Sequence, residues 1–319
     1  CGYTTPVASV RTQFKARQGG ANDARLFCVV TTKPKTQGRF YRLPNEQDLE
    51  SVKKASIELE NKVNQHIGDL SLIPDETLPV MSGVFNAPIY GHNTWGSLFS
   101  NRQSLALTTL VKLIKDVGEK LADTKDKGLA DAVQCCLALS LDKQGDLSNS
   151  LTRWKQDAEC PVNLFGRQAI PMIWDFAEAF ILSNSSGSWQ SMYERTVYAI
   201  EQYYYDQPNY GQTEQANAAH HPLPDDFVQC LFSDPPYYNA IPYADLSDFF
   251  YVWLRRTLGN IYPSLFTTVT TPKDEEICEM AGWDSVRYPH KDGKWFEQQM
   301  QKAMASKPKS FSKRVIFTE

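Results

Sequence analysis

The sequence lacks a long hydrophobic run, since no segment approaches the roughly 20 consecutive apolar residues that a membrane-spanning helix needs. It also lacks, at its start, the charged and then apolar segment of a secretory signal. These absences predict a protein with no membrane partner and a cytoplasmic location. The composition, 42% hydrophobic and 22% charged, is typical of a soluble globular protein.

Cysteine is scarce, and the seven cysteines are an odd number spread along the chain. Paired C-x2-C spacing, which a structural zinc site uses, is missing, so Cys1 has no partner at that spacing. We therefore expect mostly reduced core residues and no disulfide framework. The seven positions are Cys1, Cys28, Cys135, Cys136, Cys160, Cys230 and Cys278.

A large excess of one charge is also missing, because the formal net charge is −4. That value does not by itself indicate a nucleic-acid-binding protein. Residues 1–45, however, hold eight basic residues against the single acid Asp23. This arm either lies along nucleic-acid phosphates or forms a basic hairpin surface in water, and no aromatic residues alternate with its charges to support base contact. The basic residues are Arg11, Lys15, Arg17, Arg25, Lys33, Lys35, Arg39 and Arg42.

The chain does contain a short apolar run, 227–232, that ends in Ser-Asp-Pro-Pro-Tyr-Tyr. Its length and flanking residues predict a buried strand of a parallel sheet. Pro235 and Pro236 cannot donate to a sheet ladder and fix their own φ, so the backbone leaves the strand in one stiff geometry. Loops at the carboxyl ends of strands are where open α/β sheets bind their ligands.

The residues of this loop suit the recognition of an amino group on a nucleic-acid base. The Asp234 carboxylate and a carbonyl of the rigid turn can accept both hydrogens of an exocyclic amine, while the Tyr237 ring can stack on the base. The sequence Asp234-Pro235-Pro236-Tyr237 resembles the DPPY motif of the amino-methyltransferases that modify adenine N6 in DNA. The alternative is a strand that ends in a proline turn, with Tyr237 as an ordinary half-buried ring.

Hydrophobic periodicity predicts the remaining elements. Three strands are expected near the start, with a turn at Gly19-Gly20, and a last strand at 314–317 is expected to lie parallel to 227–232. Asn101 and Asp245 are expected to cap helices. The predicted N-terminal strands are 6–14, 25–31 and 38–43, and the predicted helices are 46–67, 101–117, 129–141, 168–182, 189–205, 246–258 and 294–306.

The loop 73–100 is rich in proline and glycine, and long loops of this kind are often functional. Its end, 90–103, mixes aromatic rings, amides and Arg102. This segment either touches a nucleotide or is a loop anchored by Trp95 and Phe99.

The segment 233–276 is longer and more specific than the tetrapeptide. It resembles the large DUF1156-type adenine-specific DNA methylases that carry an internal zinc ribbon, and Cys1-Gly2 is similar to the second half of the first knuckle of that ribbon. In the family, a glycine-rich DPFAGGG motif precedes the ribbon and holds S-adenosylmethionine, and this sequence contains no such cluster. The resemblance therefore implies an internal portion of a longer methyltransferase. Further similar segments are 38–44, 90–103, 132–154 and 165–179.

The resemblance implies an α/β fold. It would be a partial Rossmann-like methyltransferase sheet that uses S-adenosylmethionine, with a large helical insert and a small N-terminal β unit. Three domains are expected: 1–45 as a remnant of the zinc ribbon, 46–221 as a mainly helical target-recognition insert, and 222–319 as the segment that carries the motif.

The implied function is methyl transfer from S-adenosylmethionine to adenine N6 in DNA. Asp234 and the Pro235 carbonyl would accept the amine hydrogens, Tyr237 would stack, and Pro236 would hold the turn. The alternatives are cytosine N4 methylation and a non-catalytic nucleic-acid-binding or scaffold protein of a phage-defence system.

The implied partners are DNA and defence-system proteins, with Cys1 as a zinc ligand in the full-length protein. Ser233 and Tyr238 are second-rank site candidates. The adenosylmethionine pocket is expected largely outside this chain, so we expect the chain alone neither to bind this donor well nor to methylate DNA.

Overall fold

The computed structural model describes residues 2, 4–33, 35–81, 83–123, 126–203, 211–220, 223–224, 232–305 and 316–317. The chain folds into two compact units. Unit 1 consists of Cys1–Tyr205 and Asp248–Thr270, and unit 2 consists of Asp206–Ser247 and Thr271–Glu319. Each sheet that the described residues form has two strands. The mixed helix and strand content confirms the predicted α/β class at a coarse level, and the Rossmann-like sheet stays a prediction.

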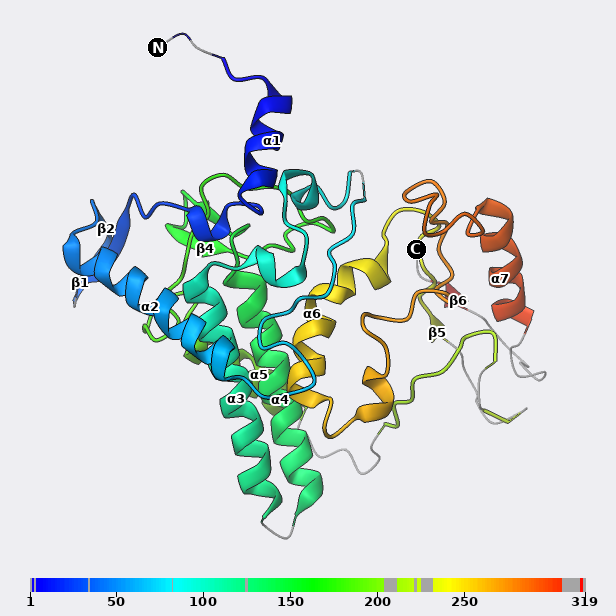
Figure 1. The fold of residues 1–319 in the computed structure, drawn as a ribbon. Coiled ribbons are helices and arrows are strands. Elements are labelled where there is room, and N and C mark those ends of the chain that lie inside the picture. The colour runs from blue at the N-terminus through cyan, green and yellow to red at the C-terminus, as the bar shows by residue number, and fades with distance from the viewer. Residues whose placement is uncertain are drawn as a thin grey trace. The chain divides into compact units, whose positions relative to one another are not determined.

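The first element of unit 1 is a helix, so the predicted strand at 6–14 is wrong. Helix α1 (Val7–Ala16) begins after Pro6 (Figure 1). The apolar residues Val7, Val10 and Phe14 are spaced by three and four, which suits a helical face. The turn at 19–20 consequently follows a helix and does not join two strands.

A β-hairpin follows, built from β1 (Val29–Lys33) and β2 (Thr36–Arg42) in antiparallel pairing. Strand β2 confirms the strand predicted at 38–43, whereas β1 begins four residues later than the predicted 25–31. The Tyr41 hydroxyl donates a hydrogen bond of 2.9 Å to Glu159 Oε1, between β3 (Arg153–Lys155) and β4 (Cys160–Val162). The hairpin is thereby tied to a distant turn of the same unit.

Four helices follow the hairpin, and side-chain caps fix where three of them begin. They are α2 (Glu46–Gln65), α3 (Asn101–Ala122), α4 (Lys127–Leu147) and α5 (Trp189–Tyr203). Asn45 caps α2, Ser100 caps α3 and Asp126 caps α4. The prediction that Asn101 caps α3 is therefore wrong by one residue. Helices α3 and α4 lie side by side as an antiparallel pair, and α2 packs on α3 while α5 packs on α4 (Figure 1).

The core of unit 1 joins the loop before α3 to helix α6 (Tyr243–Leu258), most of which belongs to this unit. Trp95 and Phe249 have ring centroids 6.3 Å apart, and Phe99 and Trp253 have centroids 5.4 Å apart. All four rings are fully buried. Trp95 and Phe99 thus anchor the loop, which is the second of the two alternatives for the segment 90–103.

The predicted helix at 168–182 is wrong, because these residues form an irregular segment. Ile170 is fully buried and exchanges backbone hydrogen bonds with the segment 84–86: its N–H donates to Val84 O at 2.8 Å, and its O accepts from Asn86 N–H at 3.0 Å. Pro171 has no N–H to donate and disfavours a helical conformation at Ile170. The long-range backbone bonds therefore replace those of a helix.

Unit 2 contains the only parallel strand pairing between named strands that the described residues make. Strand β5 (Phe232–Ser233) pairs with β6 (Ile316–Phe317), and Phe232 lies opposite Ile316. This is the parallel neighbour predicted for the motif strand, and the predicted residues 227–231 and 314–315 lie outside the described residues. Helix α7 (Gly293–Ala305) confirms the helix predicted at 294–306. None of the helices in the described part of the chain is long and apolar enough to cross a membrane.

Candidate active site

The motif Asp234-Pro235-Pro236-Tyr237 directly follows β5 and ends in two tight turns. The Tyr238 N–H donates to Pro236 O at 3.0 Å, and the Ala240 N–H donates to Tyr237 O at 2.8 Å. Tyr238 has a φ of 48°, which lies in the left-handed region. This backbone conformation is energetically unfavourable for a residue that has a Cβ atom. The two prolines are half-buried, whereas Asp234 and Tyr237 are exposed, Tyr237 by 48%. The turns thus present the carboxylate and the ring to solvent at the carboxyl end of a strand.

Tyr238 anchors the loop on the rest of unit 2. Its ring packs edge to face on Phe296 of α7, with centroids 4.6 Å apart. Its hydroxyl occupies the place that a Cβ would take at Gly293, the first residue of α7. Its carbonyl accepts a 3.0 Å hydrogen bond from the Glu279 N–H. Of the two adjacent tyrosines, Tyr238 therefore acts as the anchor and Tyr237 is the ring left for a ligand.

Tyr243, the first residue of α6, is a site residue that the sequence reasoning missed. Burial raises the pKa of its phenol, Tyr237 and Cys278 raise it further, and a hydrogen bond from the Tyr237 backbone lowers it in part. The charge of Asp234 makes the smallest of these contributions and also raises this pKa. The repeat of a Pro-Tyr pair, at 236–237 and again at 242–243, is the sequence signal that could have found it.

Asp245 holds the start of α6 in place, but it does not cap the helix as predicted. The helix begins at Tyr243, and the Asp245 carboxylate is fully buried within the first turn. It accepts a hydrogen bond of 2.6 Å from Arg287 Nη1 and one of 3.0 Å from the Tyr288 hydroxyl. Burial lowers the pKa of Arg287, but its bonds to Asp284 and Asp245 outweigh burial and raise it overall. The motif loop therefore leads into a helix start that is fixed by a charged network.

A second buried charge, Lys291, braces the backbone beside this helix. Its ammonium group donates to the carbonyls of Lys273 and Glu276, the latter at 2.9 Å. Burial lowers the pKa of Lys291, and the nearby Glu276 opposes this change. The Glu276 carboxylate in turn accepts a hydrogen bond of 2.9 Å from the Ala244 N–H in the first turn of α6. The helix dipole favours an anion at this end of the helix. Lys291 is fully buried, so its role is structural.

Of the two second-rank candidates, Tyr238 is the anchor described above, and Ser233 ends β5. The Ser233 hydroxyl is buried and has no hydrogen-bond partner among the described residues. Cys1 lies outside the described residues, and no group of three metal-binding side chains is found in the part of the chain that the structure describes. The structure thus places Asp234 and Tyr237 on one exposed loop, and it leaves the predicted zinc ligand untested.

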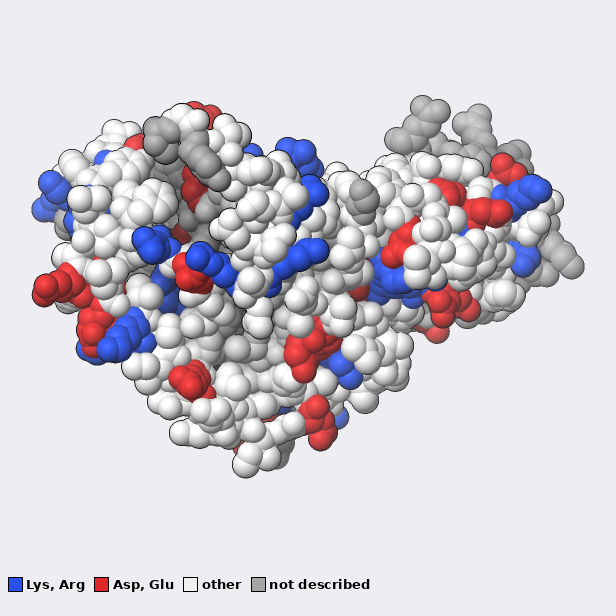
Figure 2. All heavy atoms as spheres, turned by 45° about the horizontal axis from the view of Figure 1, so that its top comes forward, with Lys and Arg blue, Asp and Glu red and all other residues white. Residues whose placement is uncertain are grey.

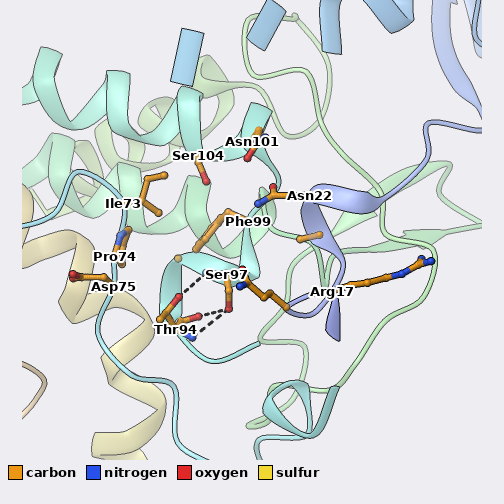
Figure 3. A pocket seen from close by; sticks show the side chains of 13 residues that line it. Arg17, Asn22, Ile73, Pro74, Asp75, Thr94, Ser97, Phe99, Asn101 and Ser104 are labelled. Atoms are coloured by element: carbon orange, nitrogen blue, oxygen red, sulfur yellow. Dashed lines mark hydrogen bonds between the residues drawn. The ribbon is translucent and has the colours of Figure 1, made fainter. Parts of the chain in front are cut away.

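A cavity of about 290 Å³ lies in unit 1 and includes none of the motif residues (Figure 3). Several of the polar side chains that line it already form hydrogen bonds or ion pairs with other residues of the chain. The Ser97 N–H and hydroxyl both donate to Thr94, and the Asn101 amide donates to Ser56. Arg17 extends away from the other labelled side chains and pairs with Asp23 at 2.8 Å. The cavity therefore offers few polar groups to a ligand, and we place the candidate active site at the motif.

Comparison of the chain with protein-family models, with curated proteins and with solved structures finds no match. The assignment of a function consequently depends on the residues of the site itself.

Proposed function

We propose that the protein is an amino-methyltransferase that acts on adenine N6 in DNA, and that the motif loop of unit 2 binds the target base. One observation carries this proposal. Asp234 and Tyr237 lie three residues apart on the motif loop, both exposed, directly after a strand in parallel pairing. An acceptor and a stacking ring three residues apart match the two needs of binding a base by its amino group.

The chemistry assigned to the loop is positioning. The Asp234 carboxylate accepts one hydrogen of the amine and the Pro235 carbonyl accepts the other, so the nitrogen lone pair turns away from the loop. Tyr237 stacks on the ring, and Pro236 keeps the backbone in one conformation. Adenine N6 is a weak nucleophile, and holding it in an attack geometry is the main contribution that these side chains can make.

The methyl donor of this proposal is S-adenosylmethionine, which supplies an electrophilic methyl group when bound. The residues described around the motif offer the acceptors for a base, but they include no glycine-rich turn after a strand that fits the donor. We therefore assign no residue of this chain to the donor. The proton released from the nitrogen has Asp234 as its nearest acceptor in this scheme.

The anchoring of the loop supports the assignment of Tyr237 over Tyr238 as the stacking ring. Both tyrosines are exposed, but Tyr238 is held by Phe296 and by the close approach of Gly293, whereas Tyr237 packs on no other aromatic ring among the described residues. A hydrogen bond from the Tyr237 backbone also lowers the pKa of the Tyr243 phenol. A rigid platform reduces the ordering cost that a base would otherwise meet on binding.

The test is methylation sequencing of DNA from cells that express the full-length protein or its variants, since the donor pocket is expected largely outside this chain. Asp234→Ala is expected to abolish methylation, Tyr237→Ala to reduce it at least about tenfold, and Tyr237→Phe to retain most of it, because phenylalanine still stacks. Asp274→Ala, which removes an exposed carboxylate of the same unit, is the matched control and should methylate normally.

The position of the modified atom distinguishes the two methylation chemistries. Methylated adenine supports the proposal, and methylated cytosine at N4 moves it to the other exocyclic amine that the same loop can bind. Unmodified DNA in cells that express the unaltered full-length protein would refute the methyltransferase proposal and favour the non-catalytic nucleic-acid-binding alternative.

A further inference from the structure

Helix α1 presents a basic face to solvent although it is only ten residues long. Arg11 and Lys15 are four residues apart, which places them on the same side of the helix, and the helix contains no acid and no buried residue. A helix this short is marginal in water on its own and needs tertiary contacts. Gly91 provides one, since a Cβ there would lie 2.8 Å from Lys15 Cα and 3.0 Å from Phe14 O.

Three aromatic rings form a cluster against the same helix. Phe14 and Trp174 have centroids 5.1 Å apart, Tyr90 and Trp174 have centroids 5.2 Å apart, and both contacts are edge to face. Contacts from two rings fix the orientation of the indole. Trp174 nevertheless keeps 55% of its surface exposed. The fold thus places a fixed, exposed ring from position 174 beside a basic helix from the start of the chain, which the sequence order alone did not suggest.

The charge around this ring is positive after internal pairs are removed. The Arg11 guanidinium lies 5.7 Å from the centre of the Tyr90 ring, and neither Arg11 nor Lys15 forms an ion pair with a described residue. Arg17 is paired with Asp23, and Asp175 is the one exposed acid adjacent to Trp174 in the sequence. Figure 2, which brings the top of Figure 1 forward, shows Lys and Arg side chains together with some Asp and Glu side chains on this face.

We propose that the surface formed by Arg11, Lys15, Tyr90 and Trp174 binds single-stranded nucleic acid. An unpaired base would stack on Trp174, and neighbouring phosphates would contact Arg11 and Lys15. Cations and a stacking ring are the two features that sequence-tolerant single-strand binding requires. Duplex DNA offers phosphates but hides the faces of its bases, so it would leave the exposed indole without a partner.

This surface does not depend on methyl transfer, because all its residues belong to unit 1 and the motif loop belongs to unit 2. It favours the first of the two alternatives left open for the basic arm, contact with phosphates. Positions 90 and 174 place two aromatic rings beside Phe14 of the arm.

The test is fluorescence anisotropy of a labelled single strand of about 12 nucleotides and of the matched duplex, titrated with the full chain at several salt concentrations without S-adenosylmethionine. Trp174→Ala is expected to weaken single-strand binding about tenfold, and Trp174→Phe to weaken it much less. Arg11→Ala with Lys15→Ala should lower the salt slope by about 0.7 for each phosphate that the variant no longer neutralises. The effect of the Trp174 variants should be small or absent for the duplex, because its base faces are hidden.

Two variants of unit 1 serve as matched controls. Lys53→Ala with Lys54→Ala removes two exposed charges from α2, and Tyr198→Ala removes an exposed ring from α5. Neither should change single-strand binding beyond about twofold. Equal binding by Trp174→Ala and the unaltered chain would overturn the stacking role, and an unchanged salt slope in the α1 variant would overturn the phosphate role. Neither result bears on base methylation, so the two proposals fail separately.

Discussion

Arg256 of α6 and Glu76 lie 180 residues apart in the sequence and form a buried ion pair, with Nη1 2.8 Å from Oε1. Their side chains are 5% and 4% exposed. Arg256 also donates from Nε to Ser71 O at 2.9 Å. This one side chain therefore ties a late helix of unit 1 to the segment 71–76.

Glu76→Ala is expected to lower the free energy of unfolding of unit 1 by about 3–5 kcal/mol, because it leaves the buried Arg256 charge with only the exposed Asp75 as an ion-pair partner. Asp75→Ala is the matched control. Asp75 is 69% exposed and lies 3.8 Å from Arg256 Nη2, so its loss should cost less than about 1 kcal/mol. Urea denaturation of both variants checks this, and equal midpoints would contradict it.

Asp142 on α4 should make the protein less stable as the pH rises. Its carboxyl group is buried, Oδ1 has no hydrogen-bond partner among the described residues, and burial raises its pKa well above the usual range. The native state therefore holds a proton that the unfolded chain releases above about pH 4. The contribution to stability is full at low pH and falls as the pH rises from there to the native pKa.

Asp142→Asn is expected to raise the free energy of unfolding at pH 7 by about 1–3 kcal/mol, with a smaller gain near pH 4. Denaturation at both pH values, relative to Asp131→Asn on the same helix, isolates the effect from other carboxyl groups. A gain that does not depend on pH would show that the carboxyl group is not the cause.

Gly293→Ala should destabilise unit 2 by about 1–3 kcal/mol, because the new methyl group overlaps the Tyr238 hydroxyl. Tyr238→Phe removes that hydroxyl and leaves the ring contact with Phe296 in place. The double variant should therefore recover a part of the loss, with a coupling of at least about 0.5 kcal/mol. A double-mutant cycle by thermal denaturation measures it, and simple additivity would mean that the loop is anchored by other contacts.

Cys278 should react with iodoacetamide far more slowly in the native protein than after unfolding. It is 1% exposed, and burial together with Glu276 raises its pKa to about 12. The reactive thiolate is therefore scarce at pH 8. Peptide mass spectrometry can compare it with Cys160, which is partly exposed in unit 1. Equal labelling rates for the two cysteines would contradict the buried position.

The elements that the sequence predicted well are those with a regular apolar period and a local end signal. Helix α2 begins after Asn45 and ends two residues before the predicted end, since its cap and its period lie within the same short segment. The motif turn was also predictable, because two prolines restrict the backbone locally. Residues 6–14 have apolar spacings that suit a strand or a helix, and contacts of Phe14 with the distant Tyr90 and Trp174 favour the helix.

The parts of the site that were missed depend on contacts between residues far apart in sequence. Asp245 was predicted to cap a helix, but its carboxylate accepts hydrogen bonds from Arg287 and Tyr288, which lie more than 40 residues later. Residues 168–182 have an apolar period, yet Ile170 pairs with the segment 84–86 through its backbone. Local patterns carry no information about such partners, so they could not reveal either arrangement.

The division of unit 1 into two stretches of chain has a consequence for synthesis on the ribosome. Phe249 and Trp253 complete the aromatic core, but they are made after the segment 206–247, which belongs to unit 2. Trp95 and Phe99 therefore lack Phe249 and Trp253 as packing partners until α6 leaves the exit tunnel. During that interval the nascent chain exposes apolar rings, and its helices are open to misassociation and to capture by chaperones.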